Sequence, residues 1–302
     1  MEKEQVLSNF VYPILTSIIG GLILSYVSLL IPLKSEYEVS YIWLWTRIFL
    51  VFVISFTIIL FFMTKYRNKT KPIKVIVFDF DGTLTYNNGL RSSWEKIWIH
   101  LGYKVQDCQQ YLDQFRQGKI DHQEWCDITC RKFKEKNLTR GTLESISKEI
   151  QLMDGVKEIL YKLKNEDHLK LYIVSGSIIQ LIEILFGNNI DDYFDGYKAN
   201  IMLFHIDNRL AKIEGTKYDF EGKADFIRKI AKKEKLKSPS EILFIGNSDN
   251  DEYAYRSGAQ TLCFNPKNAN FRNKRIWHRH FRADSFFDLY DYIKKKYPFE
   301  EE

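Results

Sequence analysis

The segment from Val75 to Thr85, Val-Ile-Val-Phe-Asp-Phe-Asp-Gly-Thr-Leu-Thr, restricts the possible folds of this chain more than any other. Its apolar run is typical of a buried strand in a parallel sheet. The run ends in Asp79 and Asp81, and open α/β sheets bind their ligands beyond the carboxyl ends of the strands. Gly82 then permits a sharp turn. An isolated Asp-x-Asp more often marks a solvated strand end, so the interpretation depends on the rest of the chain.

Two further strands are predicted to end in polar, turn-forming segments. Leu169–Val174 leads into Ser175–Ser177, and Glu241–Ile245 leads into the loop Gly246–Asp251. Helical patterns separate these strands, and this alternation predicts a parallel sheet whose carboxyl ends meet at one edge. The predicted fold class is therefore α/β with a Rossmann-like parallel sheet core.

The segment Tyr86–Ile150 has Trp, Leu, Phe and Ile at helical spacings and few strand signals, so it is predicted to be a helical insertion. The hydrophobic pattern predicts further elements outside this insertion. They are a hairpin of Tyr197–Phe204 and Leu210–Tyr218, a strand at Thr261–Phe264, and helices over about 155–163, 177–186, 222–235 and 285–296, with another starting near 252.

Oxygen-bearing side chains would gather where the three strands end. The carboxylates of Asp79, Asp81, Asp249 and Asp251, with the amide of Asn247, are hard oxygen ligands. Mg²⁺ prefers such ligands, and no soft ligand competes at these positions. The sequence therefore predicts a magnesium site.

A phosphate site is predicted beside it. Ser175 and the backbone N–H groups at and after Gly176, where a helix is expected to begin, would bind a phosphate oxygen. Lys223 lies at the start of another predicted helix and would neutralise a transferring phosphoryl group. In isolation Lys223 would be read as a solvated lysine, and Ser175 as a helix N-cap.

These motifs follow one another over roughly Ile73 to Ile293: Asp79-Phe-Asp81-Gly-Thr83, then Val174-Ser175-Gly176-Ser177, then Lys223 within Glu-Gly-Lys-Ala-Asp, then Gly246 to Asp251. Together they resemble the haloacid dehalogenase superfamily of phosphohydrolases. More narrowly they resemble its phosphoserine-phosphatase-like branch, in which a helical cap lies between the first and second motifs, here at about 86–150. Four motifs in order are far more specific than any one alone.

The resemblance implies a role for each matched residue. Asp79 would be the nucleophile that forms an aspartyl-phosphate, and Asp81 the general acid and then general base. Ser175, Gly176 and Lys223 would bind the phosphoryl group. Four residues would bind Mg²⁺, namely Asp79, Asp81 through its carbonyl oxygen, Asn247 and Asp251.

One residue departs from the family pattern. The acidic loop usually begins Gly-Asp, but this chain has Asn247 at the second position. An amide oxygen can bind Mg²⁺ but carries less charge, so a lower metal affinity is expected. Two functions follow: a Mg²⁺-dependent phosphatase, or a catalytically weak membrane signalling protein that binds a phosphorylated ligand.

Residues 1–70 are predicted to be a membrane anchor that precedes the hydrolase domain at 71–302. Two apolar segments, at about 10–33 and 41–63, are each long enough to cross a hydrocarbon core of about 30 Å as a helix. Basic residues crowd after the second segment, so both termini and the hydrolase domain are expected in the cytoplasm. Gly20 and Gly21 are a weak signal for self-association of these helices.

Composition and residue spacing indicate which partners and metal sites are expected. The net charge of +5, from 44 basic and 39 acidic residues, by itself argues neither for nor against a nucleic-acid partner, and none is expected. A basic aromatic stretch, Arg272–Arg282, is interpreted as a solvated face or a surface near lipid headgroups. Cys126 and Cys130 are interpreted as reduced core residues, because their spacing does not match a zinc site. The expected partners are a phosphorylated small molecule or a lipid headgroup, and the membrane.

Overall fold

The computed structural model describes residues 48–49, 51–60, 71–86, 90, 92–266 and 276–299. The chain divides into two compact units, Met1–Lys69 and Thr70–Glu302. In the first unit, residues 48–49 and 51–60 are helical. No helix among the described residues is long and apolar enough to span a membrane. The predicted span at 10–33, and the parts of 41–63 on either side of this helix, lie outside the described residues, so the anchor stays a prediction.

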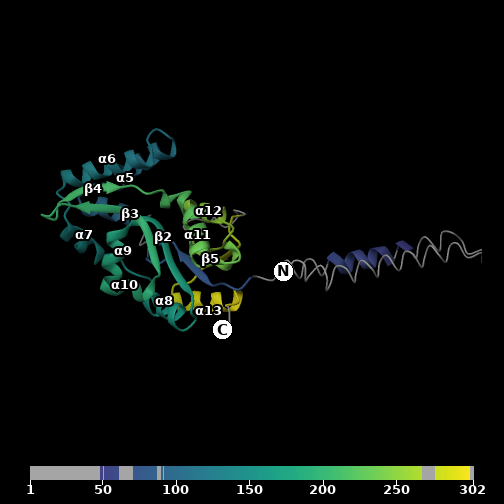
Figure 1. The fold of residues 1–302 in the computed structure, drawn as a ribbon. Coiled ribbons are helices and arrows are strands. Elements are labelled where there is room, and N and C mark those ends of the chain that lie inside the picture. Colours follow the sequence, from purple (N-terminus) through teal and green to yellow (C-terminus); the bar gives the residue numbers. More distant parts are fainter. Residues whose placement is uncertain are drawn as a thin grey trace, which may run out of the picture. The chain divides into compact units, whose positions relative to one another are not determined.

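The second unit contains a sheet with helices packed on it (Figure 1). Its strands are β1 (Val75–Phe78), β2 (Lys170–Ile178), β3 (Gly196–Phe204), β4 (Leu210–Glu214), β5 (Ile242–Gly246), β6 (Gln260–Phe264) and β7 (Arg279–Phe281). The described helices of this unit are α4 (Ser93–His100), α5 (Val105–Arg116), α6 (His122–Glu135), α7 (Arg140–Ser147), α8 (Val156–Asn165), α9 (Ile179–Phe186), α10 (Ile190–Tyr193), α11 (Gly222–Lys233), α12 (Glu252–Tyr255) and α13 (Phe286–Lys296). Short 3-10 turns are η2 (Gly187–Asn189), η3 (Lys217–Asp219), η4 (Pro239–Glu241) and η5 (Asp249–Asp251).

The sheet confirms the predicted parallel core. The strand order is β4-β3-β2-β1-β5-β6-β7, and every described pairing is parallel except β3 with β4. β1 lies between β2 and β5, so the first, second and last predicted motifs follow three adjacent strands. The predicted convergence of their carboxyl ends is therefore present.

Side chains of β1 alternate between two cores, which explains why the whole strand is apolar. Ile76 and Phe78 face one core together with residues of α8 and α13. Val75 and Val77 face the other core, against α11. A strand covered by helices on both faces has no polar side, and this is the pattern that its sequence shows.

The inserted helices form the predicted cap, but the cap has a second component. α4 to α7 occupy the segment that was predicted to be helical, and Trp98 and Phe133 lie at the centre of their core. Met202 of β3 and Ile213 of β4 pack into this same core. The sequence predicts this hairpin without linking it to the cap, whereas in the structure its strands contribute to the cap core. Cys126 and Cys130 are buried in this core, as predicted.

One interpretation of the sequence is incomplete, because the structure adds an edge strand and a buried tryptophan where only a surface was expected, although His278 and Arg282 are exposed. The basic aromatic stretch was interpreted as a solvated or lipid-facing surface, but residues 279–281 form β7, which pairs with β6. Trp277 is buried in the core beside Phe244. The Nδ1 atom of His278 accepts a hydrogen bond from the backbone N–H of Thr261 at 3.1 Å. In this segment, backbone pairing with β6 and burial of Trp277 determine the structure despite the many basic residues. Residues 267–275 lie outside the described part of the chain.

The hairpin's role in the cap predicts unequal effects for two neighbouring residues of β3. Met202 is 1% exposed and lies in the cap core, whereas Leu203 is 40% exposed. We expect Met202→Ala to lower the free energy of unfolding by about 2–4 kcal/mol, and Leu203→Ala by less than about 1 kcal/mol. Equilibrium unfolding in urea measures both changes. Equal losses would contradict the assignment of this strand to the cap.

Candidate active site

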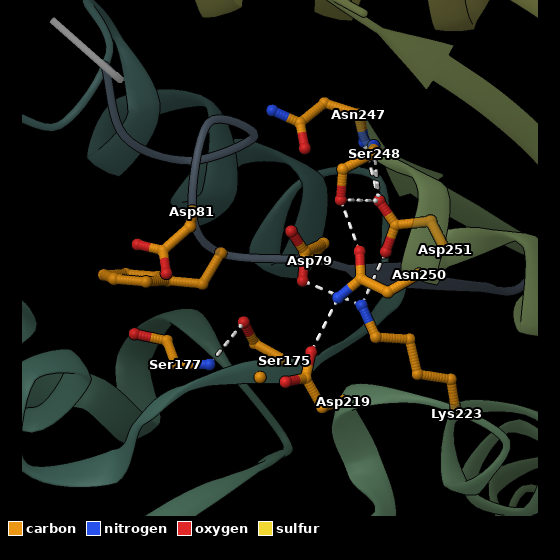
Figure 2. Close-up of polar contacts among 12 residues, drawn as sticks. Asp79, Asp81, Ser175, Ser177, Asp219, Lys223, Asn247, Ser248, Asn250 and Asp251 are labelled. Carbon is orange, nitrogen blue, oxygen red and sulfur yellow. Dashed lines mark hydrogen bonds and ion pairs between the residues drawn. The ribbon is translucent and has the colours of Figure 1, made fainter. Parts of the chain in front are cut away.

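The site lies where β1, β2 and β5 end (Figure 2). Asp79 follows β1 directly, Ser175 lies within β2, and Asn247 follows β5. Lys223 comes from the first turn of α11 and extends to the same point. The structure thus brings together these sequence-predicted residues, although Lys223 lies 144 positions from Asp79 in the chain.

A buried lysine joins two buried carboxylates at the centre of the site. The Nζ atom of Lys223 lies 3.0 Å from Oδ1 of Asp79 and 2.5 Å from Oδ1 of Asp251. The lysine side chain is fully buried. A glycine is needed just before it, because a Cβ atom on Gly222 would lie 2.4 Å from the carbonyl oxygen of Lys217. This tight turn positions the lysine on the first turn of α11.

The second carboxylate oxygen of Asp251 shapes the loop that follows β5. It accepts hydrogen bonds from the backbone N–H groups of Asn247 at 2.8 Å and Ser248 at 2.9 Å. A Cβ atom on Gly246 would lie 2.5 Å from this oxygen, so only glycine fits there. Asp251 therefore has both oxygens engaged, one with Lys223 and one with the loop. If Asp251 also binds a metal ion as predicted, one of its two carboxylate oxygens must contact both the ion and its present partner.

The side chain of Asn247 is fully buried, and neither its oxygen nor its nitrogen has a hydrogen-bond partner in the described structure. An unpaired buried amide costs about 1–3 kcal/mol, so such a group usually has a ligand. Figure 2 places this carboxamide on the side of Asp79 that faces away from Ser175. No group of three or more His, Cys, Asp or Glu residues among those described is placed to bind a metal ion. The fit to Mg²⁺ therefore rests on the unpaired oxygen of Asn247 and the adjacent carboxylates.

Asp81 contacts the first helix of the cap. Its Oδ2 atom accepts a hydrogen bond of 2.9 Å from the hydroxyl of Ser93 in α4. A pocket opens beside it, lined by Asp81, Thr85, Tyr86, Leu90, Ser92, Ser93, Lys96 and Ile150. This pocket lies between residues of the cap and residues that follow β1.

Sequence reasoning missed Asp219 and Asn250. Asp219 accepts a hydrogen bond of 2.7 Å from the amide of Asn250. The carboxylate of Asp219 lies so close to Gly176 that a Cβ atom there would be 2.0 Å from its Oδ1 atom. Asn250 belongs to the acidic loop and was within reach of the motif, but no sequence pattern singles out Asp219.

Burial and crowding of like charge change the acidity of the central groups. Burial, followed by the carboxylate of Asp251, raises the pKa of Asp79 to about 7, although Lys223 opposes this. Burial alone would lower the pKa of Lys223, but the carboxylates of Asp251 and Asp79 outweigh it and raise this pKa. When both carboxylates are ionised they share one lysine, so the metal-free cluster then has one negative charge in excess. A divalent cation would balance that charge.

The raised pKa of Asp79 predicts a pH-dependent stability of the metal-free protein. The folded state binds a proton that the unfolded state releases near pH 4, so this contribution is full below about pH 4 and lost as pH rises through 7. With EDTA present, the free energy of unfolding of the wild type should therefore fall relative to Asp79→Asn between pH 4 and pH 7. Urea unfolding at several pH values tests this, and a constant difference would contradict it.

Solved structures of other proteins share the fold of this chain. A phosphoserine phosphatase, solved as an analogue of its phospho-aspartyl intermediate, is 22% identical with a TM-score of 0.57, covering 74% of this chain and 99% of that one. A substrate-bound phosphoserine phosphatase is 20% identical with a TM-score of 0.58 and the same coverage. A hydrolase of the haloacid dehalogenase family from Salmonella enterica subsp. enterica serovar Typhi is 19% identical with a TM-score of 0.59, covering 72% of this chain and 70% of that one.

At these identities the structural likeness shows the fold alone. No curated protein matches the sequence. The sequence profile of the haloacid dehalogenase-like hydrolases matches residues 73–257, which is more than half of the chain and includes every site residue described above. The chain therefore belongs to the haloacid dehalogenase-like hydrolase family.

Proposed function

We propose that this protein is a Mg²⁺-dependent phosphatase that hydrolyses a phosphomonoester through an aspartyl-phosphate on Asp79. The observation that carries the proposal is the buried Lys223, which contacts the carboxylate of Asp79 at 3.0 Å beside the hydroxyl of Ser175. An anionic nucleophile attacks a phosphoryl group only if the negative charge of that group is neutralised. The ammonium group of Lys223 lies where it would neutralise this charge.

The reaction would proceed in two steps. A carboxylate oxygen of Asp79 attacks phosphorus, the bond to the leaving oxygen breaks, and Asp81 gives that oxygen its proton. Asp81 then takes a proton from water, whose oxygen attacks the aspartyl-phosphate and releases inorganic phosphate. Ser93 holds Asp81 toward the pocket beside the cap, where the leaving group would lie.

The residues that would hold Mg²⁺ are Asp79, the carbonyl oxygen of Asp81, Asn247 and Asp251. The bound ion would supply positive charge against the repulsion between phosphate and carboxylate. The unpaired amide of Asn247 supports its place in this set.

The substrate is a phosphorylated small molecule or a lipid headgroup. The leaving-group pocket is lined by hydroxyl-bearing residues, by the apolar Leu90 and Ile150, and by Lys96, whose ammonium group donates to the carbonyl oxygen of Glu149. Such a lining suits a compact alcohol that carries an anionic or polar group. Phosphoserine belongs in any screen, because two of the similar structures are phosphoserine phosphatases.

We also propose that residues 1–70 anchor the enzyme in a membrane by two helices, with both termini and the hydrolase domain in the cytoplasm. The chain enters the domain at Ile73, whose backbone N–H donates to the carbonyl oxygen of Pro298 at 2.8 Å. This entry lies at the amino end of β1, whereas Asp79 follows its carboxyl end.

The mechanism predicts that Asp79→Asn and EDTA each abolish phosphate release. A screen of amino-acid, sugar, nucleotide and lipid phosphates, with the lipids presented in vesicles, would identify the substrate. We expect at least a thousandfold loss in Asp79→Asn, because an amide is a poor nucleophile. Asp207→Asn, in an exposed turn of the hairpin, is the matched control and should keep full activity. Full activity of Asp79→Asn would exclude the aspartyl-phosphate.

Asn247 separates the phosphatase from the alternative, a weak catalyst that serves as a membrane signalling protein. Asn247→Asp adds a carboxylate to the proposed metal site, so we expect Mg²⁺ to bind about tenfold more tightly. Calorimetric titration with Mg²⁺ measures this directly. Binding of inorganic phosphate with no turnover in the wild type at any Mg²⁺ or Mn²⁺ concentration would favour the alternative function.

A further inference from the structure

The backbone carbonyl of Gly176 receives two side-chain hydrogen bonds from different parts of the protein. Nε1 of Trp94, in helix α4 of the cap, donates to it at 2.8 Å. Nδ2 of Asn200, in strand β3, donates to the same oxygen at 2.7 Å. Neither donor belongs to the sequence motifs that predicted the site.

The side chains of Trp94 and Asn200 supply hydrogen bonds that the regular pairing of β2 with β3 does not. The register of β2 with β3 shifts between Val174 and Ile178, so the intervening residues of β2 leave the regular ladder. The half-buried Gly176 carbonyl has lost its strand partner, and such a group is normally paired with another donor. Trp94 and Asn200 supply it at Gly176.

Fixing this carbonyl also fixes the next N–H group. The peptide between Gly176 and Ser177 is planar, so its N–H points opposite to its C=O. That N–H donates to Oγ of Ser175 at 3.1 Å. The hydroxyl of Ser175 therefore acts as acceptor toward its own loop and keeps its proton to donate to a phosphoryl oxygen.

Asn200 is itself held in the orientation that this requires. Its Oδ1 atom accepts a hydrogen bond of 2.6 Å from the backbone N–H of Thr216. The opposite end of the amide, Nδ2, is therefore presented to Gly176. Asn200 is 1% exposed, so water does not compete for these contacts.

We propose that Trp94 and Asn200 are positioning residues for phosphate binding, which act through the Gly176–Ser177 peptide on the hydroxyl of Ser175. The proposal rests on the phosphatase function stated above. It makes phosphate affinity depend on the cap, because Trp94 belongs to α4. The neighbouring Ser93 contacts Asp81 and Ser177, so the start of this one helix contacts both sides of the reaction centre.

The test is Trp94→Phe, which removes the N–H donor and keeps an aromatic ring against Phe133. Binding of inorganic phosphate to the full chain with saturating Mg²⁺ is measured by calorimetry, which needs no turnover. We expect phosphate to bind about fivefold to tenfold more weakly, the effect of one hydrogen bond. Trp125→Phe is the matched control, since Trp125 of the cap makes ring contacts with Phe115 and His122 and should leave phosphate binding unchanged.

A double-mutant comparison separates positioning from general loss of structure. In a Ser175→Ala background, Trp94→Phe should have no further effect on phosphate binding, because the hydroxyl that it positions is gone. An equal loss in both backgrounds, or unchanged binding in Trp94→Phe, would overturn the proposal. If Trp94→Phe is unfolded at the assay temperature, Asn200→Leu takes its place with the same two expected results.

The outcomes also separate this inference from the proposed function. A wild type that binds phosphate but hydrolyses no phosphomonoester refutes the phosphatase, while the variants still test the positioning. A wild type that hydrolyses its substrate while Trp94→Phe binds phosphate normally refutes the positioning alone. A wild type that binds no phosphate refutes both.

Discussion

The buried ammonium group of Lys223 is the interaction on which the site depends. It stands between Asp79 and Asp251, and through Asp251 it is linked to the loop that follows β5. Removing charged groups from water costs several kcal/mol for each ion, and a buried pair repays this only with good geometry and further hydrogen bonds. The hydrogen bonds that Asp251 accepts from two backbone N–H groups are such further bonds. A cluster of this cost adds little to stability, which is why a role in binding or chemistry is the better explanation for it.

The excess negative charge of this cluster links the chemistry to the departure at Asn247. An aspartate there would place a further carboxylate beside groups that already repel one another, whereas an amide adds oxygen without charge. The asparagine therefore lowers the cost of the metal-free site as well as the attraction for a cation. Both effects follow from the same missing charge.

The sequence predicted the centre of the site because its residues follow strands. Asp79, Ser175 and Asn247 each come at or just after an apolar run, and a parallel sheet brings such positions together wherever they lie in the chain. Trp94, Asn200 and Asp219 have no such signal, since they reach the site from the cap, from β3 and from the connection after β4. Strand β7 was not predicted because it is only three residues long and two of them, Arg279 and His280, are polar, so it has no apolar strand pattern. The two membrane spans stay a prediction that concerns the other unit of the chain.

Strand β3 has a consequence for how the cap is built. The strand pairs with β2 in the sheet at its beginning and with β4 of the cap at its end. The cap is therefore not a module that could be exchanged between relatives by cutting at the two ends of the helical segment, because one of its walls is encoded more than fifty residues later. Transplanting only residues 86–150 into another member of the family would leave α6 without the hairpin strand β4 that packs against it.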